Sequence, residues 1–364
     1  MKRTALYELH KKSGAKMVEF AGWEMPLQYV GLRKEHITVR SSVGIFDVSH
    51  MGEIEITGTD STDFCQYLSS NNLKNIESGQ AQYTLLCNKN GGVVDDVIFY
   101  KYSDEQYLIC VNASNTEKDF VWINKVGREC YFNIEIKDVS PGYAQIAVQG
   151  PNSVNLVADL LGEGIKNIKR FNFSKLKWNN INLMIARTGY TGEEGYEIFL
   201  DWDKGPELWI ELIKSGHDFD VGPCGLGCRD TLRIEAGYPL YGHEIDDTTN
   251  PLEAGLGRFV KLDSDDFVGK NRIIESVESG NNRELIAFVV VDTGIPRQGY
   301  DILCGEDIIG KVTSGTHSPS LNKPIGMGLV KRNYDKNNLC IDIRNKKRRI
   351  ELVNIPFYKK NNRS

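Results

Sequence analysis

Apolar residues recur along this chain at two spacings, about 3.6 residues in some stretches and two in others, which predict helices and strands. Helical spacing covers Thr4–Lys12, Gly31–Val39, Asp60–Ser70, Glu117–Val126, Asn152–Leu161, Pro206–Ser215 and Cys224–Ala236. Strand-like runs cover Ser42–Thr57, Tyr107–Val111 and Tyr143–Val148, with hairpins over Leu85–Tyr100 and Ile181–Leu200. This order of elements predicts an α+β fold with mostly antiparallel sheets.

The texture changes beyond about Gly280, where short strands follow one another without a long helix. They are predicted at Leu285–Val291, Asp301–Cys304, Ile308–Thr313, Met327–Val330, Leu339–Ile343 and Ile350–Val353. Such a series is typical of a small β barrel or sandwich. The 364 residues exceed what one ordinary core supports, so we expect one region over residues 1–275 and a β domain over 280–364.

The first hairpin carries two adjacent carboxylates. Asn90-Gly91-Gly92 supplies residues that tolerate the positive φ of a tight turn. Asp95 and Asp96 follow inside an apolar run, so at least one should face the side that Val94 and Ile98 cover. A carboxylate there needs a partner or a role. The alternative is that one aspartate caps the turn and the other is solvated.

The second hairpin places Tyr190 and Glu197 on either side of a glycine-containing turn. Glu197 alternates with Phe199, so the two side chains share a face. A carboxylate beside aromatic rings can accept two parallel N–H donors, such as those of a 2-amino-4-oxo heterocycle. The alternative is a solvated hairpin face, since antiparallel sheets commonly have one.

Two arginines lie four residues apart on the last predicted helix, and therefore on one helix face. Arg229 and Arg233 could bind ligand carboxylates, or pair with Asp230 and Glu235. The pattern alone favours the pairs.

Composition limits the classes of function. A chain with 40% hydrophobic and 26% charged residues has a globular profile, and a net charge of -5 argues against a general nucleic-acid binder. Residues 331–364 carry eleven Lys or Arg and three Asp or Glu, a net charge of +8, which leaves -13 for the rest. This basic tail is either a solvated face or a receiver for an anionic partner or ligand.

The compartment follows from cysteines and from the N-terminus. The eight cysteines form no C-x-x-C pair and mostly lie in apolar runs, which indicates a reducing compartment. Because the chain shows no signal or transit segment, we expect a cytoplasmic protein. The longest apolar run, near Leu285–Val291, is too short to span a membrane, so no membrane partner is expected.

Several site motifs are absent from the sequence. It contains no phosphate-binding G-x-x-x-x-G-K-[ST] loop, no H-E-x-x-H and no G-x-S-x-G. Gly225-Leu226-Gly227 does not continue as a dinucleotide motif, because Asp230 occupies the last glycine position. The six histidines show no metal-ligand spacing. A metal, nucleotide-phosphate or serine-hydrolase mechanism therefore has no support, and no metal is expected.

Seven motifs together resemble the signature blocks of the glycine cleavage system T-protein family, the aminomethyltransferases. They occur in the family's order, and the resemblance extends from residue 4 to about residue 358. The motifs are Phe20-Ala21-Gly22-Trp23, Phe46-Asp47-Val48-Ser49-His50-Met51, Gly91-Gly92-Val93-Val94-Asp95-Asp96, Asn112-Ala113-Ser114, Gly189-Tyr190-Thr191-Gly192-Glu193, Arg229-Asp230-Thr231-Leu232-Arg233-Ile234-Glu235-Ala236-Gly237 and Thr313-Ser314-Gly315-Thr316-His317-Ser318-Pro319-Ser320.

The resemblance implies a three-domain cloverleaf around a folate channel, with a small β barrel as the last domain. Residues 1–275 would then hold two interleaved α+β subdomains, one of them including about 52–137. The implied enzyme takes the aminomethyl group from the dihydrolipoyl arm of the H-protein and transfers the carbon to tetrahydrofolate. The products are 5,10-methylenetetrahydrofolate, ammonia and the reduced arm. The implied partners are the lipoylated H-protein and tetrahydrofolate, which is a co-substrate.

The resemblance also assigns residues. Asp96 matches the family's key carboxylate near the folate N10, Glu197 the residue that binds the pterin edge, and Arg229 a binding arginine. Further residues fall where the family lines its channel: Met51, Tyr83, Tyr100, Asn112, Tyr190 and Tyr238.

Two other functions are compatible with the same superfamily. One is a tetrahydrofolate-dependent demethylase of a sulfonium or methylamine compound. The other is a folate-binding accessory protein without turnover. The intact Ser49-His50-Met51 and Asp95-Asp96 motifs favour the aminomethyltransferase over the demethylase. Cys224 and Cys228 fall in the matching helix entry without the reactive cysteine motif of the accessory proteins.

Overall fold

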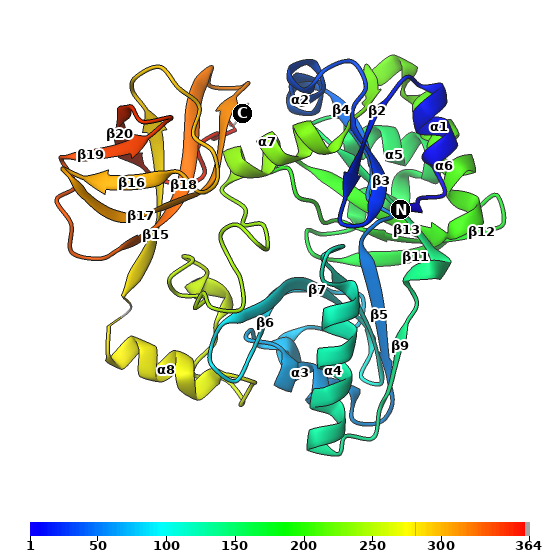
Figure 1. The fold of residues 1–364 in the computed structure, drawn as a ribbon. Helices are drawn as coiled ribbons and strands as arrows, with labels where there is room; N and C mark the ends of the chain where they lie inside the picture. The colour runs from blue at the N-terminus through cyan, green and yellow to red at the C-terminus, as the bar shows by residue number, and fades with distance from the viewer. Residues whose placement is uncertain (281, 361–364) are drawn as a thin grey trace. The chain divides into compact units, whose positions relative to one another are not determined.

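A computed structural model describes residues 1–280 and 282–360 of the chain (Figure 1). The chain divides into two compact units. The first consists of Met1–Thr84 and Asp96–Arg229, and the second of Leu85–Asp95 and Asp230–Ser364. The expected boundary between residues 275 and 280, and the subdomain over about 52–137, remain predictions.

Six strands form one sheet of the first unit, in the order β11-β12-β13-β10-β4-β14. They are β4 (Val43–Asp47), β10 (Tyr143–Gln149), β11 (Phe173–Trp178), β12 (Ile181–Ala186), β13 (Gly195–Asp201) and β14 (Val221–Pro223). Helices α5 (Ser153–Leu161) and α6 (Gly205–Ser215) pack on one face, where Ile146, Ile198 and Leu208 share a buried apolar cluster. Because strand residues alternate, Glu197 and Phe199 point to the opposite face.

A five-stranded sheet in the order β6-β7-β8-β5-β9 packs against that opposite face. Its strands are β5 (Gly52–Thr57), β6 (Ala81–Cys87), β7 (Val93–Ser103), β8 (Gln106–Val111) and β9 (Glu135–Asp138). Tyr100 and Cys110 of this sheet join Met184 and Phe199 of the six-stranded sheet in one apolar cluster. The rings of Tyr100 and Phe199 meet edge to face at 5.5 Å between centroids. Helices α3 (Ser61–Leu68) and α4 (Thr116–Cys130) contact β8 and β5, respectively.

The predicted hairpin over Leu85–Tyr100 is confirmed as β6, a tight turn and β7. The Asn88 side chain makes the turn, because its Oδ1 accepts hydrogen bonds from the backbone N–H groups of Asn90 at 2.9 Å and Gly92 at 3.1 Å. A Cβ on Gly92 would lie 1.8 Å from the Asp247 carbonyl oxygen, so only glycine fits there. Asp95 is fully buried. Asp95 is therefore not the solvated aspartate of the alternative.

We expect Asn88→Ala to lower the free energy of unfolding by about 2 kcal/mol, because it removes three hydrogen bonds. The third runs from Nδ2 to the Asp247 carbonyl at 2.8 Å. Urea denaturation measures the effect, with Asn90→Ala as the control, since that side chain is exposed in the same turn. Equal stability of the two variants would show that the Asn88 amide does not hold the turn.

The single strand predicted over Ser42–Thr57 is wrong, because the segment forms β4 and β5 in two different sheets. Asp47 Oδ1 accepts a hydrogen bond from the Ser49 N–H at 2.9 Å, and this local bond bends the backbone after β4. The runs on both sides of the bend alternate in the same way, so the pattern predicts one continuous strand.

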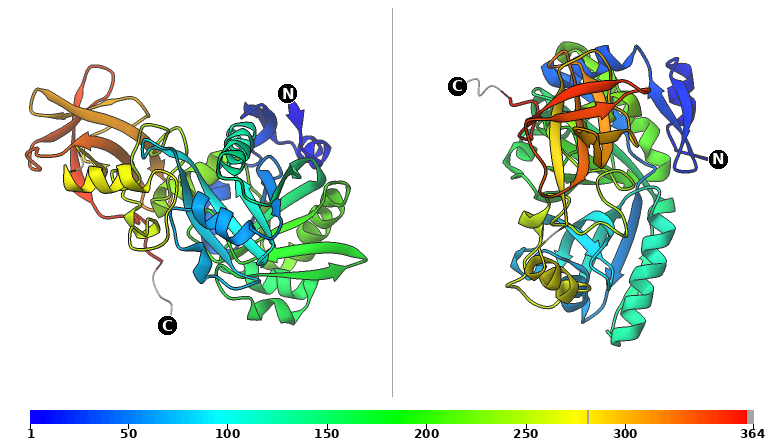
Figure 2. Two further views of the ribbon diagram at one scale, coloured as in Figure 1. Left: turned by 90° about the horizontal axis from the view of Figure 1, so that it is seen from below. Right: turned by 60° about the vertical axis from the view of Figure 1, so that its left-hand side comes forward.

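The predicted C-terminal β domain is a closed barrel in the order β15-β18-β17-β16-β19-β20. Its strands are β15 (Arg283–Val290), β16 (Asp301–Cys304), β17 (Asp307–Ser318), β18 (Lys323–Lys331), β19 (Leu339–Asp342) and β20 (Lys347–Val353). Antiparallel pairing of β15 with β20 closes the barrel around Phe288, Ile302 and Ile341. Figure 2 shows these strands, yellow to red, in two further views of the ribbon.

The remaining predicted helices are confirmed with shifted ends as α1 (Tyr7–Lys12), α2 (Leu32–Ser41) and α7 (Leu226–Ala236). Elements that the sequence pattern did not predict include a small sheet of β1 (Lys2–Arg3), β2 (Lys16–Phe20) and β3 (Trp23–Gln28), and helix α8 (Lys270–Glu278). No described helix has the length and apolar character needed to cross a membrane.

Candidate functional site

Glu197 lies in the interface between the six-stranded and the five-stranded sheet, and 6% of its surface is exposed. Its neighbours on the flanking strands are Ala147 on β10 and Ala186 on β12. Their small side chains leave the carboxylate without bulky neighbours in its own sheet. The alternative of a solvated hairpin face is therefore wrong for this residue.

A hydroxyl group holds one oxygen of this carboxylate. Thr188 Oγ1 donates to Glu197 Oε2 at 2.5 Å, and the Tyr100 hydroxyl lies 3.5 Å from Thr188 Oγ1. The other oxygen, Oε1, accepts no hydrogen bond from a described residue. Oε1 is not among the fully buried atoms that lack a partner, so it is accessible. An accessible carboxylate oxygen is a candidate acceptor for a ligand N–H.

Burial raises the pKa of Glu197, whereas the Thr188 hydrogen bond and the positive charge of Arg229 act in the opposite direction. Burial also raises the pKa of the Tyr100 phenol and of the Cys110 thiol, with the nearby Glu197 charge as a further cause. Both groups therefore stay protonated near neutral pH and add no negative charge beside Glu197.

Arg229 does not form the ion pair that the pattern favoured. Its guanidinium carbon lies 4.9 Å from the centroid of the Tyr190 ring, which is cation–π distance. Its Nη1 is buried and has no hydrogen-bond partner among the described residues. A buried guanidinium nitrogen without an acceptor is a candidate for binding an anionic or carbonyl group of a ligand.

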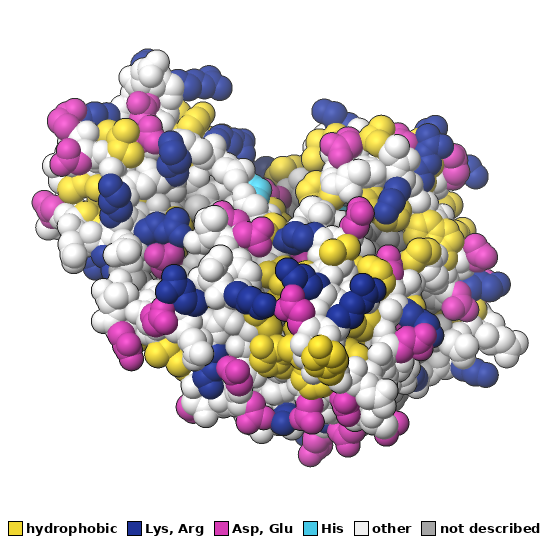
Figure 3. Space-filling model, turned by 60° about the horizontal axis from the view of Figure 1, so that its bottom comes forward, with side chains coloured by type: hydrophobic (Ala, Val, Ile, Leu, Met, Phe, Trp, Pro, Cys, Tyr) yellow, Lys and Arg dark blue, Asp and Glu magenta, His cyan; other side chains and the backbone are white. Residues whose placement is uncertain are grey.

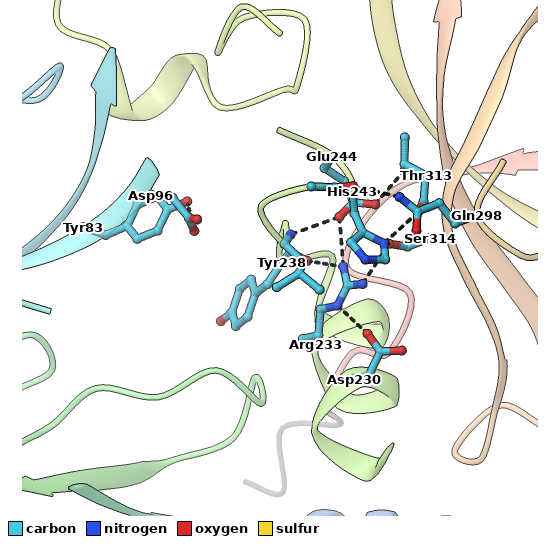
Figure 4. Close-up of polar contacts among 12 residues, drawn as sticks. Tyr83, Asp96, Asp230, Arg233, Tyr238, His243, Glu244, Gln298, Thr313 and Ser314 are labelled. Atoms are coloured by element: carbon cyan, nitrogen blue, oxygen red, sulfur yellow. Dashed lines mark hydrogen bonds and ion pairs between the residues drawn. The ribbon is translucent and has the colours of Figure 1, made fainter. Parts of the chain in front are cut away.

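Arg233, the second arginine of that helix, is paired inside the protein. It lies in the second unit, where it bonds Asp230 through Nε and Glu244 through Nη1, each at 2.9 Å, and Ser314 Oγ through Nη2 at 2.8 Å (Figure 4). Glu235 accepts hydrogen bonds from Ser318 and Ser320 instead. The prediction of internal pairs is thus correct for Arg233 with Asp230 and wrong for Arg229 and for Glu235.

Asp96 lies on β7 in the first unit. Its Oδ2 accepts a hydrogen bond from the Tyr83 hydroxyl at 3.0 Å, and its Oδ1 one from Asn112 Nδ2 at 2.8 Å. Figure 4 shows the Tyr83 ring and the Asp96 carboxylate together. Asp96 and Tyr100 are four residues apart on the same face, about 13 Å along an extended strand. The same sheet face thus bears the Asp96 carboxylate and the Tyr100 hydroxyl that reaches Thr188 beside Glu197.

The remaining predicted residues divide between the units. Met51, just before β5, packs on the cluster that contains Tyr100 and Phe199. The Arg229 guanidinium lies over the Tyr190 ring. Tyr238 belongs to the second unit, where its backbone bonds that of Arg233 and its carbonyl accepts from Arg233 Nη1 at 3.2 Å. The other eight predicted residues all belong to the first unit.

Thr188 and His50 are polar residues of this region that sequence reasoning did not select. His50 is buried, its Nδ1 has no hydrogen-bond partner among the described residues, and burial lowers its pKa to about 4. It is therefore a neutral imidazole at pH 7. A lone threonine after a strand carries no signal in one sequence, whereas His50 lies within the motif of residues 46–51 that resembles the T-protein family.

A separate groove of about 500 Å³ lies farther along the same strands. Tyr102, Tyr143 and Asp201 are among its lining residues, and Lys175 Nζ lies 3.8 Å from the Tyr102 ring centroid. None of the predicted site residues lines it. Within the described chain, no group of three or more His, Cys, Asp or Glu side chains is placed to hold a metal ion.

Comparison with known protein families covers nearly the whole chain. The model of the GCVT N-terminal domain matches residues 6–264, and that of the glycine cleavage T-protein C-terminal barrel domain matches residues 283–359. The chain belongs to the glycine cleavage T-protein family. The resemblance inferred from the sequence motifs is thereby confirmed.

Individual members of the T-protein family agree with this assignment over their full lengths. An aminomethyltransferase of Alkaliphilus oremlandii is 46% identical, with 98% of each chain covered. One of Caldanaerobacter subterraneus subsp. tengcongensis is 44% identical, with 99% of this chain and 97% of that protein covered. The chain is therefore an enzyme of the transferase class.

A solved T-protein structure has the same fold. The glycine cleavage system aminomethyltransferase T of Bartonella henselae superposes with a TM-score of 0.90 at 32% identity, covering 98% of both chains. The predicted α+β class and the C-terminal barrel are confirmed by this match and by the strand order.

Proposed function

We propose that this T-protein family member is the tetrahydrofolate-dependent aminomethyltransferase of a glycine cleavage system. It takes the aminomethyl group from the dihydrolipoyl arm of an H-protein and gives 5,10-methylenetetrahydrofolate, ammonia and the reduced arm. The observation that carries the proposal is the buried Glu197 carboxylate, with Oε2 bound by Thr188 and Oε1 open to a ligand. That arrangement suits the two adjacent N–H donors of a pterin.

The reaction balances without an oxidant or a metal. The C–S and C–N bonds of the aminomethyl group break, and its carbon forms bonds to N5 and N10 of tetrahydrofolate. The two folate N–H protons end on ammonia and on the lipoyl sulfur. The carbon passes through an iminium-like cation, which a fixed carboxylate stabilises.

Within this proposal, Asp96 supplies that carboxylate. Hydrogen bonds from Tyr83 and Asn112 keep its position fixed, so it can stabilise developing positive charge and orient N10 or accept its proton. Glu197 and Arg229 bind the folate, and Met51, Tyr100 and Tyr190 line its channel. Tyr238 stays a channel residue that the family resemblance predicts. The basic tail and Arg229 are candidate contacts for the folate glutamate or for an acidic face of the H-protein.

The proposed setting is the cytoplasm, with the H-protein and folate as partners and without nucleic acid or membrane. Figure 3 supports the absence of a nucleic-acid surface on the face it draws, because Lys or Arg and Asp or Glu side chains are interspersed there.

The test is an assay with purified protein, tetrahydrofolate and aminomethylated H-protein that follows ammonia and methylenetetrahydrofolate. Ammonia release that needs both folate and the lipoyl carrier is the expected result. Folate binding without that release would overturn the proposal in favour of the demethylase or the accessory protein. A screen of sulfonium and methylamine donors would then separate those two.

A further inference from the structure

Three groups beneath the proposed folate site form a hydrogen-bonded chain with one possible direction. A threonine hydroxyl has a single proton, and the 2.5 Å contact assigns it to Glu197 Oε2. Thr188 must then accept from its other neighbour, the Tyr100 hydroxyl at 3.5 Å. Tyr100 is fully buried and keeps its proton, so the chain runs from Tyr100 through Thr188 to Glu197.

This direction favours an ionised Glu197, because a hydroxyl donor stabilises a carboxylate more than a carboxylic acid. A protonated carboxyl oxygen at Oε2 would place two hydrogens between the same two atoms. The short bond from Thr188 therefore favours the carboxylate, and it also fixes the rotation of the group so that Oε1 stays open. The neighbours Ala147 and Ala186 offer no hydrogen bond that could replace Thr188 in this task.

We propose that Thr188 is the positioning residue of the folate site, which holds Glu197 ionised with Oε1 open and thereby selects a ligand edge with adjacent N–H donors. This inference rests on the proposed function and extends it to a residue that does not itself contact the heterocycle. It makes Thr188 a determinant of specificity for the 2-amino-4-oxo edge.

The groups that face Glu197 from the surrounding elements limit how its charge can be controlled. They are Tyr100 on β7, Cys110 on β8 and Arg229 on α7, whereas β10 and β12 present Ala147 and Ala186. Tyr100 and Cys110 are neutral, so Arg229 is the one cation among these groups. Without the Thr188 hydroxyl, Arg229 is the one remaining group among these that opposes the rise of the Glu197 pKa caused by burial.

The sign of the pH effect follows from this balance. Folate binding needs the ionised form, so affinity falls as the pH drops through the pKa of Glu197. The pKa is already raised by burial, and the Thr188 bond acts to lower it. Removing that bond raises it further and moves the loss of affinity to higher pH. Protonation of the folate is the same for every variant and cancels in the comparison.

The experiment titrates 5-formyltetrahydrofolate, an air-stable folate with the same edge, into the full chain from pH 5 to pH 9. For Thr188→Val we expect about tenfold weaker binding at pH 7 and a midpoint about one pH unit higher than in the parent. Thr188→Ser restores the hydroxyl and should recover most of both effects. Tyr100→Phe should shift the midpoint in the same direction but less, which keeps a readout if Thr188→Val does not fold.

A matched control is Thr313→Val in the second unit, where the Thr313 hydroxyl donates to buried Glu244 at 2.6 Å (Figure 4). It removes the same group from a buried carboxylate and should leave the midpoint in place. An unchanged midpoint in Thr188→Val and Tyr100→Phe, or a Thr188→Ser variant as weak as Thr188→Val, would overturn the inference. A parent protein that binds no folate would instead overturn the proposed function.

Discussion

Asp96→Asn is expected to lower kcat by about 100- to 1,000-fold while the Kd for tetrahydrofolate changes by less than about threefold. Asparagine has nearly the same shape and can still bond Asn112 and Tyr83, which hold the carboxylate at 2.8 and 3.0 Å. What it lacks is the negative charge. That charge matters only once the transferred carbon becomes cationic, so the transition state is affected and folate binding is not.

Steady-state kinetics with aminomethylated H-protein and direct folate binding separate these two quantities. Asp104→Asn is the control, because this aspartate is 83% exposed where it pairs with Lys101. It removes one carboxylate beyond the end of the same strand and should leave kcat unchanged. Parallel losses of turnover and affinity in Asp96→Asn would assign Asp96 to binding instead of catalysis.

Glu197→Ala is expected to weaken tetrahydrofolate binding by about 100-fold, because two buried N–H donors of the ligand lose a charged acceptor. Glu197 is 6% exposed, so water replaces its carboxylate poorly. The loss should appear in the Kd at every pH at which Glu197 is ionised in the parent protein. It should shrink at low pH, where the parent protein loses the same charge.

Isothermal titration measures this Kd, with Glu194→Ala as the matched control. Glu194 immediately precedes β13 and pairs with Arg187 at 2.9 Å, and its side chain is 44% exposed. Its removal should change the Kd by less than about twofold. If Glu197→Ala binds folate as tightly as the parent protein, the assignment of Glu197 to the pterin edge is wrong.

The two predictions differ because the two carboxylates differ in how their hydrogen bonds are filled. Asp96 has both oxygens occupied by protein donors, whereas Glu197 has one occupied and one open. An acceptor already bonded on both oxygens acts chiefly through its charge and its position. A carboxylate with one unoccupied oxygen, such as Glu197, acts chiefly by accepting a hydrogen bond from the ligand.

Local signals were sufficient for the hairpin over Leu85–Tyr100 and for the C-terminal barrel strands. Turn residues such as Gly91 and the alternation of apolar side chains act within a few residues of each other, so one sequence reveals them. The same alternation gave a wrong prediction for Ser42–Thr57, which is two strands and not one. Its two halves alternate alike, and what separates them is the bond of Asp47 to Ser49 and the different sheets that they join.

The candidate site divides in a similar way. The sequence by itself determined the family and the α+β class, because motifs of characteristic composition occur in the family's order. It also predicted Asp96 and Glu197 as the carboxylates of the site. The tertiary structure alone decided that Arg233 is hydrogen-bonded to Glu244 and Ser314, whereas Nη1 of Arg229 has no partner among the described residues. It alone also placed the Thr188 hydroxyl against Glu197. The physical reason is that periodicity and turn chemistry act between near neighbours in the chain. Burial and hydrogen bonding instead depend on residues that only folding brings within 3 Å.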